Sequence, residues 1–408
     1  MNVHCAHIVG NASCIQLLFD FYLNSSNMSL DDDTSSASTL ALLDDYAFKS
    51  DLLTMMSDAW PETNDELKRR AKAILLEMGS TITSVGPHGV SPSDLLDAMM
   101  EGSEKAGLSS GVRYAAAAII VAYQKGKASN SSASELTKLA QDWWLFFLWP
   151  FKKALRPSHS PQSDISTPTL RASEVVADTV PATSRGSKFR NLISERQGNK
   201  CAVTGTLDTH KGPYPLGTQG REGYLHAAHI LRRFIVHEHS GGNRTAGTID
   251  IIKHYTRLPA SIMDDLAGII DNPENGMLLE TTLHSYFDNY AWCLHPTDVL
   301  HKYTVHWLSP KLGWKNFTEV QFQDHSQTGI QLPDPRFIAL HAAVAHVLHL
   351  SGAAEVIDKV YDAFFDEDPA VVSGNRASEE DFIIRLSLIG LMTDNHQLPT
   401  NPHGMHAH

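Results

Sequence analysis

Cysteine is scarce in this sequence. The 408 residues include four cysteines, Cys5, Cys14, Cys201 and Cys293, and no two of them form a CxxC pair. Thiols that are so few and so scattered exclude a disulfide framework, and they give no sign of a zinc ribbon. We therefore expect a reducing, intracellular compartment, with cytoplasm and nucleus not distinguished.

Long apolar runs are also missing. The most apolar segment, residues 143–151, has nine residues and is followed by two lysines. A membrane-spanning helix needs about 20 apolar residues, so no transmembrane segment is predicted. The N-terminus lacks the basic start and apolar stretch of a secretory signal. Residues 143–151 are either a buried helix end or an anchor for a protein partner or a membrane surface.

An excess of basic charge is absent from the chain as a whole. It has 33 basic and 46 acidic side chains and a formal net charge of −13, which argues against a protein that coats nucleic acid. Residues 185–257 differ from the rest, with twelve Lys or Arg against five Asp or Glu. Basic side chains of this segment could therefore bind the phosphates of a nucleic acid.

Composition and periodicity divide the chain into segments. Apolar residues recur every three or four positions between residues 40 and 78, which predicts helices, and Ser91 and Pro92 are typical of a helix start. Residues rich in Ser, Thr and Pro mark a linker. The expected segments are a flexible lead-in (1–38), a helical domain of unknown role (39–156), a linker (157–184), a second domain (185–352), a helical extension (353–394) and a flexible tail (395–408).

The second domain mixes strands and helices, so the fold class expected for the chain is α+β. A short helix at residues 188–197 precedes a strand-like segment at 223–231. After a variable stretch come the residues Asn275 and Gly276, an apolar strand at 277–279, a helix at 281–288, and two more strand-like segments at 291–294 and 302–307. A further helix is expected at residues 333–350.

Four ordered elements of this domain resemble the HNH endonuclease family. They are Cys201 with Thr204 and Gly205, Ala227 to Ile230 with His229 inside, Asn275 followed by Leu278 and Leu279, and His284 followed by Phe287 and Asp288. The likeness covers residues 185–300 and is greatest to the subgroup without zinc-binding cysteine pairs that is common in fungal proteins. It implies a ββα-metal finger within the second domain, with extra strands and a C-terminal helical segment.

The resemblance also implies roles for individual residues. It makes His229 the base that activates water, Asn275 the residue that orients His229, and His284 a ligand of a divalent ion such as Mg²⁺ or Mn²⁺. Phosphodiester hydrolysis needs such a base and such a cation, and imidazole can serve in either role at neutral pH. Asn275 with Gly276 is equally a turn signal.

Two further residues are candidate metal ligands. Asp288 lies one helical turn after His284, where it can join the ion, support the imidazole or simply be a solvated carboxylate. Many HNH nucleases have an acidic ligand directly before the first histidine, but this chain has Ala228 there. His226 is the candidate substitute, although in an ideal strand His226 and His229 point to opposite faces. The loss of the acidic ligand puts catalysis in question.

Nucleic acid, DNA in particular, is the partner that the resemblance implies. Arg232 and Arg233 follow the proposed base directly and are candidates for binding the phosphate backbone. The leading hypothesis is a metal-dependent endonuclease, and the alternative is a catalytically degenerate HNH-fold module that binds DNA or protein. A structural zinc protein is disfavoured because Cys201 and Cys293 stand alone in sequence, and His341, His346 and His349 are interpreted as core or groove residues.

Overall fold

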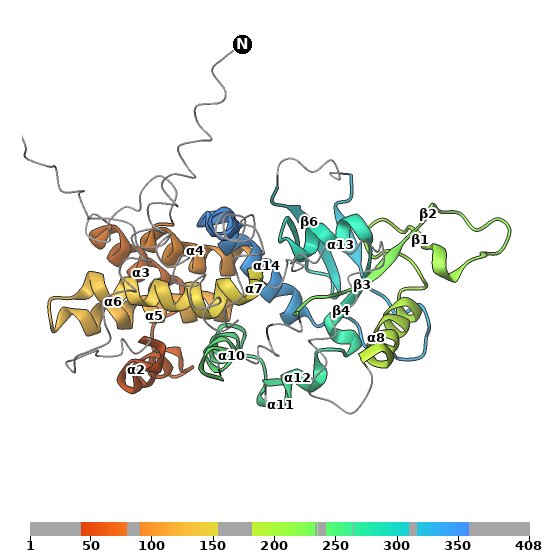
Figure 1. Cartoon of the computed structure of the whole chain (residues 1–408). Coiled ribbons are helices and arrows are strands. Elements are labelled where there is room, and N and C mark those ends of the chain that lie inside the picture. Colours follow the sequence, from red (N-terminus) through yellow and green to blue (C-terminus); the bar gives the residue numbers. More distant parts are fainter. Residues whose placement is uncertain are drawn as a thin grey trace, which may run out of the picture. The chain divides into compact units, whose positions relative to one another are not determined.

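The computed structural model describes residues 42–79, 90–153, 182–232, 235, 242–263, 265–309 and 316–358. The predicted lead-in and tail lie outside these residues, as do most of the linker and of the helical extension. Arg233, one of the two candidate phosphate contacts, also lies outside them. The chain is α+β, as predicted, with helices first and mixed strands and helices after residue 182 (Figure 1).

Helices alone make up the described part of the first segment. Ser91 caps α4 by accepting a hydrogen bond from the backbone N–H of Asp94, and Pro92 occupies the first helical position, as its fixed φ favours. Thr63 and Glu66 form a capping box at the start of α3. The elements are η1 (Leu42–Asp44), α2 (Tyr46–Met56), α3 (Asn64–Met78), α4 (Pro92–Lys105), α5 (Ser109–Lys127), α6 (Ser132–Trp143), the π-helical η2 (Trp144–Leu148) and α7 (Trp149–Lys153).

The aromatic run at residues 143–151 belongs to the core. Trp143, Trp144 and Phe147 have no exposed surface, and Trp149 and Phe151 are also buried. Only Leu145 and Phe146 are partly exposed. Of the two interpretations of this run, the structure therefore favours the buried helix end over the partner or membrane anchor, because its large side chains pack within the chain itself.

The variable stretch between the two histidine motifs is helical in its described part. It forms α10 (Gly242–Thr256), α11 (Ala260–Met263) and α12 (Leu266–Ile269). Tyr255 of α10 is fully buried, meets Tyr114 of α5 edge to face at 6.0 Å, and accepts a hydrogen bond from the hydroxyl of Ser103 on α4. The stretch is thus anchored to the helices of the first segment.

A strand–strand–helix unit follows the first helix of the second segment, α8 (Ala182–Arg196). Strand β3 (Leu225–His229) pairs antiparallel with β4 (Gly276–Glu280), with His229 opposite Gly276 and Ala228 opposite Met277. Helix α13 (Thr281–Asp288) begins directly after β4, and Figure 1 shows it beside β3 and β4. Two short strands, β1 (Leu207–Asp208) and β2 (Glu222–Gly223), pair in parallel before it, with η4 (Thr209–Lys211) between them.

A second sheet and a long helix follow the unit. Strands β5 (Trp292–Pro296), β6 (Lys302–Trp307) and β7 (Glu319–Gln321) form an antiparallel sheet in that order. Helix α14 (Pro335–Leu350) packs on both α4 and β5, and Gly102 of α4 allows the close approach, because an added Cβ would lie 2.8 Å from Val347. No helix among the described residues is long and apolar enough to cross a bilayer.

Candidate functional site

His229 lies at the end of β3, between an aromatic ring and a carboxylate. Its imidazole stacks on Phe189 of α8, with ring centroids 4.0 Å apart and planes within 7° of parallel. Its Nε2 is 2.9 Å from Oδ1 of Asp271. The side chain keeps 23% of its surface exposed, so it is held firmly yet stays accessible to water. Stacking and pairing together fix the orientation that a proton acceptor needs.

Gly276 makes room for this stack. A Cβ on Gly276 would lie 2.5 Å from Cζ of Phe189 and 2.2 Å from Cδ1 of Ile193. These distances are shorter than any normal carbon–carbon contact, so a side chain here would displace the ring that supports His229. The Asn–Gly pair of the sequence motif therefore has a packing role at its second residue.

Asn275 is buried and acts on the backbone of the loop that follows His229. Its Oδ1 accepts a hydrogen bond from the N–H of Leu231 at 2.7 Å, and its Nδ2 donates to the carbonyls of Leu231 (2.7 Å) and Ile270 (2.8 Å). It thus joins the segment after His229 to the segment that ends at Asp271. This geometry supports an indirect positioning of His229, through main chain on both sides of the His229–Asp271 pair.

The short helix η5 (Pro273–Asn275) leads into β4. The fully buried Arg196 of α8 fixes this turn by donating to the carbonyls of Pro273 and Gly276, each at 2.7 Å. Burial lowers the pKa of Arg196 to about 10, so it stays charged at neutral pH.

His284 and Asp288 lie one turn apart on α13, and their side chains meet. Nε2 of His284 is 3.3 Å from Oδ2 of Asp288, and the other carboxylate oxygen forms an ion pair with Arg232 at 2.9 Å. His284 is 16% exposed and Arg232 12%. Burial, opposed by Asp288, lowers the pKa of His284, with smaller contributions from the charges of Arg232 and His229. His284 is therefore neutral at pH 7, as a metal ligand must be.

His226 lies next to His284 rather than apart from it. Their rings meet edge to face with centroids 5.8 Å apart, and Nε2 of His226 is 3.4 Å from the hydroxyl of Thr281. Burial and the neighbouring charge of His284 lower the pKa of His226 to about 4. His226 and His284 thus lie together on one part of the finger, with the His229–Asp271 pair close enough to influence His284 electrostatically.

The donor set of α13 fits a divalent cation. Two ligands placed side by side about 2.1 Å from one octahedral ion are about 3 Å apart, close to the 3.3 Å between His284 and Asp288. Ala228 is fully buried and has no donor atom, so the position before His229 supplies none. The three-ligand group found among the described residues lies elsewhere, and the role of His226 as a ligand stays a prediction.

Sequence reasoning missed Asp271. The carboxylate is 42 positions from His229, and only the tertiary structure brings the two together. The one local signal is its place four residues before Asn275, within the turn that carries that motif. Arg232, a candidate phosphate contact, instead forms an ion pair with Asp288 in this structure.

A second group of ligand-type side chains lies elsewhere. Cys293 and His295 on β5 and His346 on α14 have donor atoms that all lie within 4.8 Å of one another, and the group can hold a metal ion. Sequence reasoning missed this group; the local signal that could have pointed to it is the Cys293-x-His295 spacing, which puts both side chains on one face of a strand. His346 could not be connected to them because it is about 50 residues further on.

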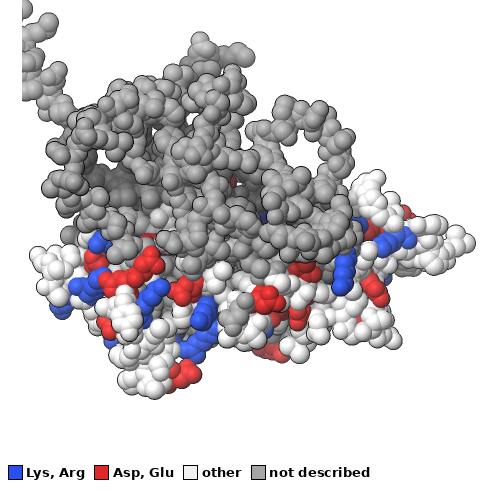
Figure 2. Space-filling model, turned by 60° about the horizontal axis from the view of Figure 1, so that its bottom comes forward, with Lys and Arg blue, Asp and Glu red and all other residues white. Residues whose placement is uncertain are grey.

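On one face of the described residues the charge is mixed rather than basic. Figure 2 shows Lys and Arg interspersed with Asp and Glu over the described residues of one face. Beside the finger, the guanidinium of Arg190 on α8 is bound to Asp208 of β1 at 2.7 Å, and that of Arg221 is bound to Glu280 of β4 at 2.8 Å. Phosphate binding in this region would therefore compete with existing carboxylate partners.

His341 provides a prediction on pH. It is buried, stacks on Phe287 at 3.7 Å, and bonds through Nε2 to the carbonyl of Phe287 at 3.1 Å. Burial lowers the pKa of His341 to about 3, whereas an unfolded histidine has a pKa of about 6.5. Between about pH 6.5 and about pH 3, His341 is protonated in the unfolded state but not in the folded state. The free energy of unfolding therefore falls by about 1.4 kcal/mol for each pH unit of acidification in this range.

We expect His341→Gln, which keeps a donor but cannot titrate in this range, to lose less stability than the wild type between about pH 7 and about pH 5. The difference should be about 2 kcal/mol, measured by urea unfolding at both pH values. Equal losses in the two proteins would show that His341 is not the buried neutral group described here.

Comparison with protein-family models gives a match described as HNH endonuclease at residues 201–295. Comparison with curated proteins and with solved structures gave no match. The matched range covers about a quarter of the chain and includes β3, β4, α13 and all three histidines of the finger, His226, His229 and His284. The strand–strand–helix geometry and this match together identify an HNH endonuclease domain at residues 201–295.

Proposed function

We propose that the finger formed by β3, β4 and α13 is the active site of a metal-dependent endonuclease that hydrolyses phosphodiester bonds of nucleic acid, with DNA as the first candidate. The observation that carries the proposal is a pair of histidine–carboxylate couples on one finger. His229 couples with Asp271 at the end of a strand, and His284 couples with Asp288 on the helix that follows.

The two couples suit different tasks. In the tautomer that donates Nε2–H to Asp271, His229 carries its lone pair on Nδ1, and we propose that this nitrogen takes the proton of water as the water oxygen attacks phosphorus. Asp271 then stabilises the imidazolium and keeps the ring in one tautomer, as a carboxylate does behind a catalytic histidine. The bond to the departing sugar oxygen breaks, and that oxygen takes a proton from solvent.

His284 and Asp288 would hold the divalent ion that the family implies. Such an ion neutralises charge on the phosphate and on the departing oxygen. Arg232 keeps Asp288 in place through their ion pair, and we propose that His226 supports the site from beside His284. Arg196 holds the turn before β4 through the carbonyls of Pro273 and Gly276, and Asn275 ties that turn to Leu231, just after β3.

A non-catalytic module that binds DNA or protein is the second candidate. The observation in its favour is Ala228, which is fully buried and replaces the acidic ligand that many members of the family have. A finger with only His284 and Asp288 as strong donors would bind its ion more weakly. The two candidates agree on the fold and differ in whether a bond is broken.

A cleavage assay separates them. Supercoiled plasmid is incubated with the full chain in Mg²⁺, in Mn²⁺ and in EDTA, and DNA binding is measured on the same samples. We expect nicked and linear products with either metal and none with EDTA. Binding of DNA without product in any metal would support the non-catalytic module and contradict the endonuclease.

A further inference from the structure

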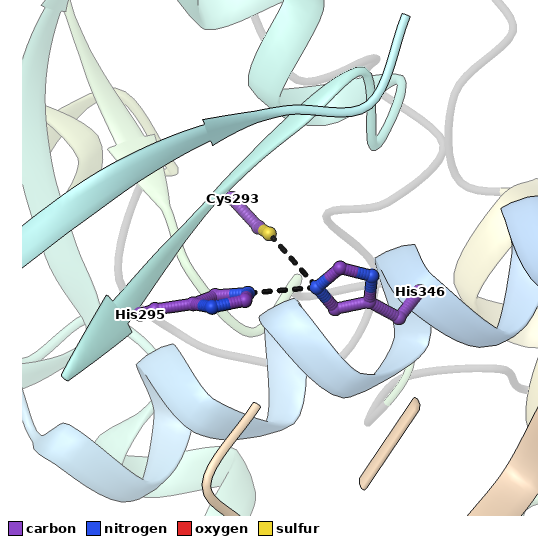
Figure 3. Close-up of side chains that lie close together, drawn as sticks. All are labelled: Cys293, His295 and His346. Atoms are coloured by element: carbon purple, nitrogen blue, oxygen red, sulfur yellow. Dashed lines mark hydrogen bonds between the residues drawn. The ribbon is translucent and has the colours of Figure 1, made fainter. Parts of the chain in front are cut away.

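Cys293, His295 and His346 meet where strand β5 packs against helix α14. Successive side chains of a strand alternate between its faces, so Cys293 and His295 share the face toward the helix. His346 comes from the facing side of α14, and Figure 3 shows the three side chains converging. Cys293 has no exposed surface, His346 has 6%, and His295 is partly buried.

The spacing of the donor atoms is close to that of a tetrahedral ion. Nε2 of His295 is 2.7 Å from Nε2 of His346, and Sγ of Cys293 is 3.8 Å from the same Nε2. Around a tetrahedral zinc ion the corresponding separations are about 3.3 Å for two imidazole nitrogens and about 3.6 Å for sulfur and nitrogen. An ion would fit if the two imidazole nitrogens moved apart by about 0.6 Å, which small rotamer changes can provide.

The surroundings keep both imidazoles ready to bind. Burial lowers the pKa of His295 to about 3 and that of His346 to about 4, so both are neutral at pH 7. His306 of β6 stacks on His295 with ring centroids 3.6 Å apart, and its Nε2 is 3.0 Å from the hydroxyl of Thr304, so the stack is itself fixed. Supporting contacts of this kind orient metal-binding histidines.

Two features oppose a cation here. Burial raises the pKa of Cys293 to about 12, so the ion must displace the thiol proton. The positive charge of Lys105 on α4 lowers the pKa values of His295, His306 and His346. The same charge would repel a cation bound between these side chains. Lys105 is exposed, so solvent screens its charge, and a bound thiolate would offset it.

We propose that Cys293, His295 and His346 bind a Zn²⁺ ion, which fastens helix α14 to strand β5 and is separate from the ion of the nuclease finger. A thiolate with two imidazoles selects zinc over Mg²⁺ or Mn²⁺, which prefer oxygen ligands. On binding, the Cys293 proton is released to solvent and the thiolate sulfur forms the bond to the metal, so affinity rises with pH.

The competing account is a metal-free core contact. Two neutral imidazoles can share one hydrogen bond at 2.7 Å if their tautomers are complementary, and Cys293 would then be an ordinary buried thiol. The two accounts differ in a property that does not involve cleavage, namely whether the sulfur of Cys293 bonds to a metal.

Cobalt(II) provides the test, because a thiolate bound to it gives an intense charge-transfer absorption that imidazole or carboxylate ligands alone do not. The full chain is stripped of metal, titrated with Co²⁺, and then titrated with Zn²⁺. We expect the band to grow to one equivalent and to disappear as Zn²⁺ displaces Co²⁺. Absence of the band in the wild-type chain would overturn the proposal whether or not any variant folds.

Substitutions assign the band to the site. Cys293→Ser should abolish it, and His346→Ala should weaken Co²⁺ binding by at least about 100-fold. Cys201→Ser is the matched control, since Cys201 is the other free cysteine in the described ranges and is also buried. It should keep the full band, as should His284→Ala in the finger. A full band in Cys293→Ser would contradict the assignment.

Discussion

His229→Ala is expected to slow cleavage by at least about 10²–10⁴-fold, the range that general-base catalysis contributes. The substitution removes the nitrogen that accepts the proton of water, and it leaves both donors of α13 in place. DNA binding and affinity for Mn²⁺ should therefore stay close to those of the wild type. The measurement is the single-turnover rate on plasmid at saturating metal.

The matched control is His325→Ala. His325 is an exposed histidine outside the finger, so its loss removes an imidazole without touching the site, and its cleavage rate should equal that of the wild type. A His229→Ala protein that cleaves at the wild-type rate would remove the proposed base. The cleavage rate of Asp271→Asn should lie between those of His229→Ala and the wild type. Asparagine keeps the contact to Nε2 of His229 but lacks the charge that stabilises the imidazolium.

Arg196→Leu is expected to lower the free energy of unfolding by at least about 3 kcal/mol. Its guanidinium has no exposed surface and donates to the carbonyls of Pro273, Gly276 and Gln331. Leucine fills the space but removes the donor from the buried carbonyl of Gly276 and from the part-buried carbonyls of Pro273 and Gln331, and it also removes the charge that these bonds hold. An unsatisfied buried group costs about 1–3 kcal/mol, more when a charged partner is lost. Urea unfolding at pH 7 measures the change.

Arg70→Leu is the control for this prediction. Arg70 has 36% of its side-chain surface exposed and pairs with Glu62 on the surface, an interaction that contributes about 0–1 kcal/mol. A loss in Arg196→Leu no larger than that in Arg70→Leu would show that the carbonyls find other donors and that the turn before β4 does not depend on Arg196.

The finger could be predicted from the sequence because its signals are local. Patterns within a few residues predicted a strand at 223–231, a strand at 277–279 and a helix at 281–288. The structure has all three, as β3 (Leu225–His229), β4 (Gly276–Glu280) and α13 (Thr281–Asp288). The i,i+4 spacing of His284 and Asp288 likewise defines a helix face without any tertiary information. The fold class was predicted for the same reason.

Tertiary contacts set the limit of that prediction. The partner of His229, Asp271, and the partner of Cys293, His346, lie 42 and 53 residues from them along the chain, and no local pattern connects either pair. Alternation in an ideal strand argued that His226 and His229 face apart, and it did not reveal that His226 lies against His284 on the helix. The roles of these residues stay predictions, as do the domain boundaries.

The most direct measurement of the central claim is cleavage by the full chain after its metals have been removed and returned one at a time. Zn²⁺ alone should refill the Cys293 site and leave plasmid intact, and subsequent Mg²⁺ or Mn²⁺ should restore nicking in the wild type but not in His229→Ala. Intact plasmid in the wild type under every combination, with the protein folded and binding DNA, would contradict a metal-dependent endonuclease at residues 201–295.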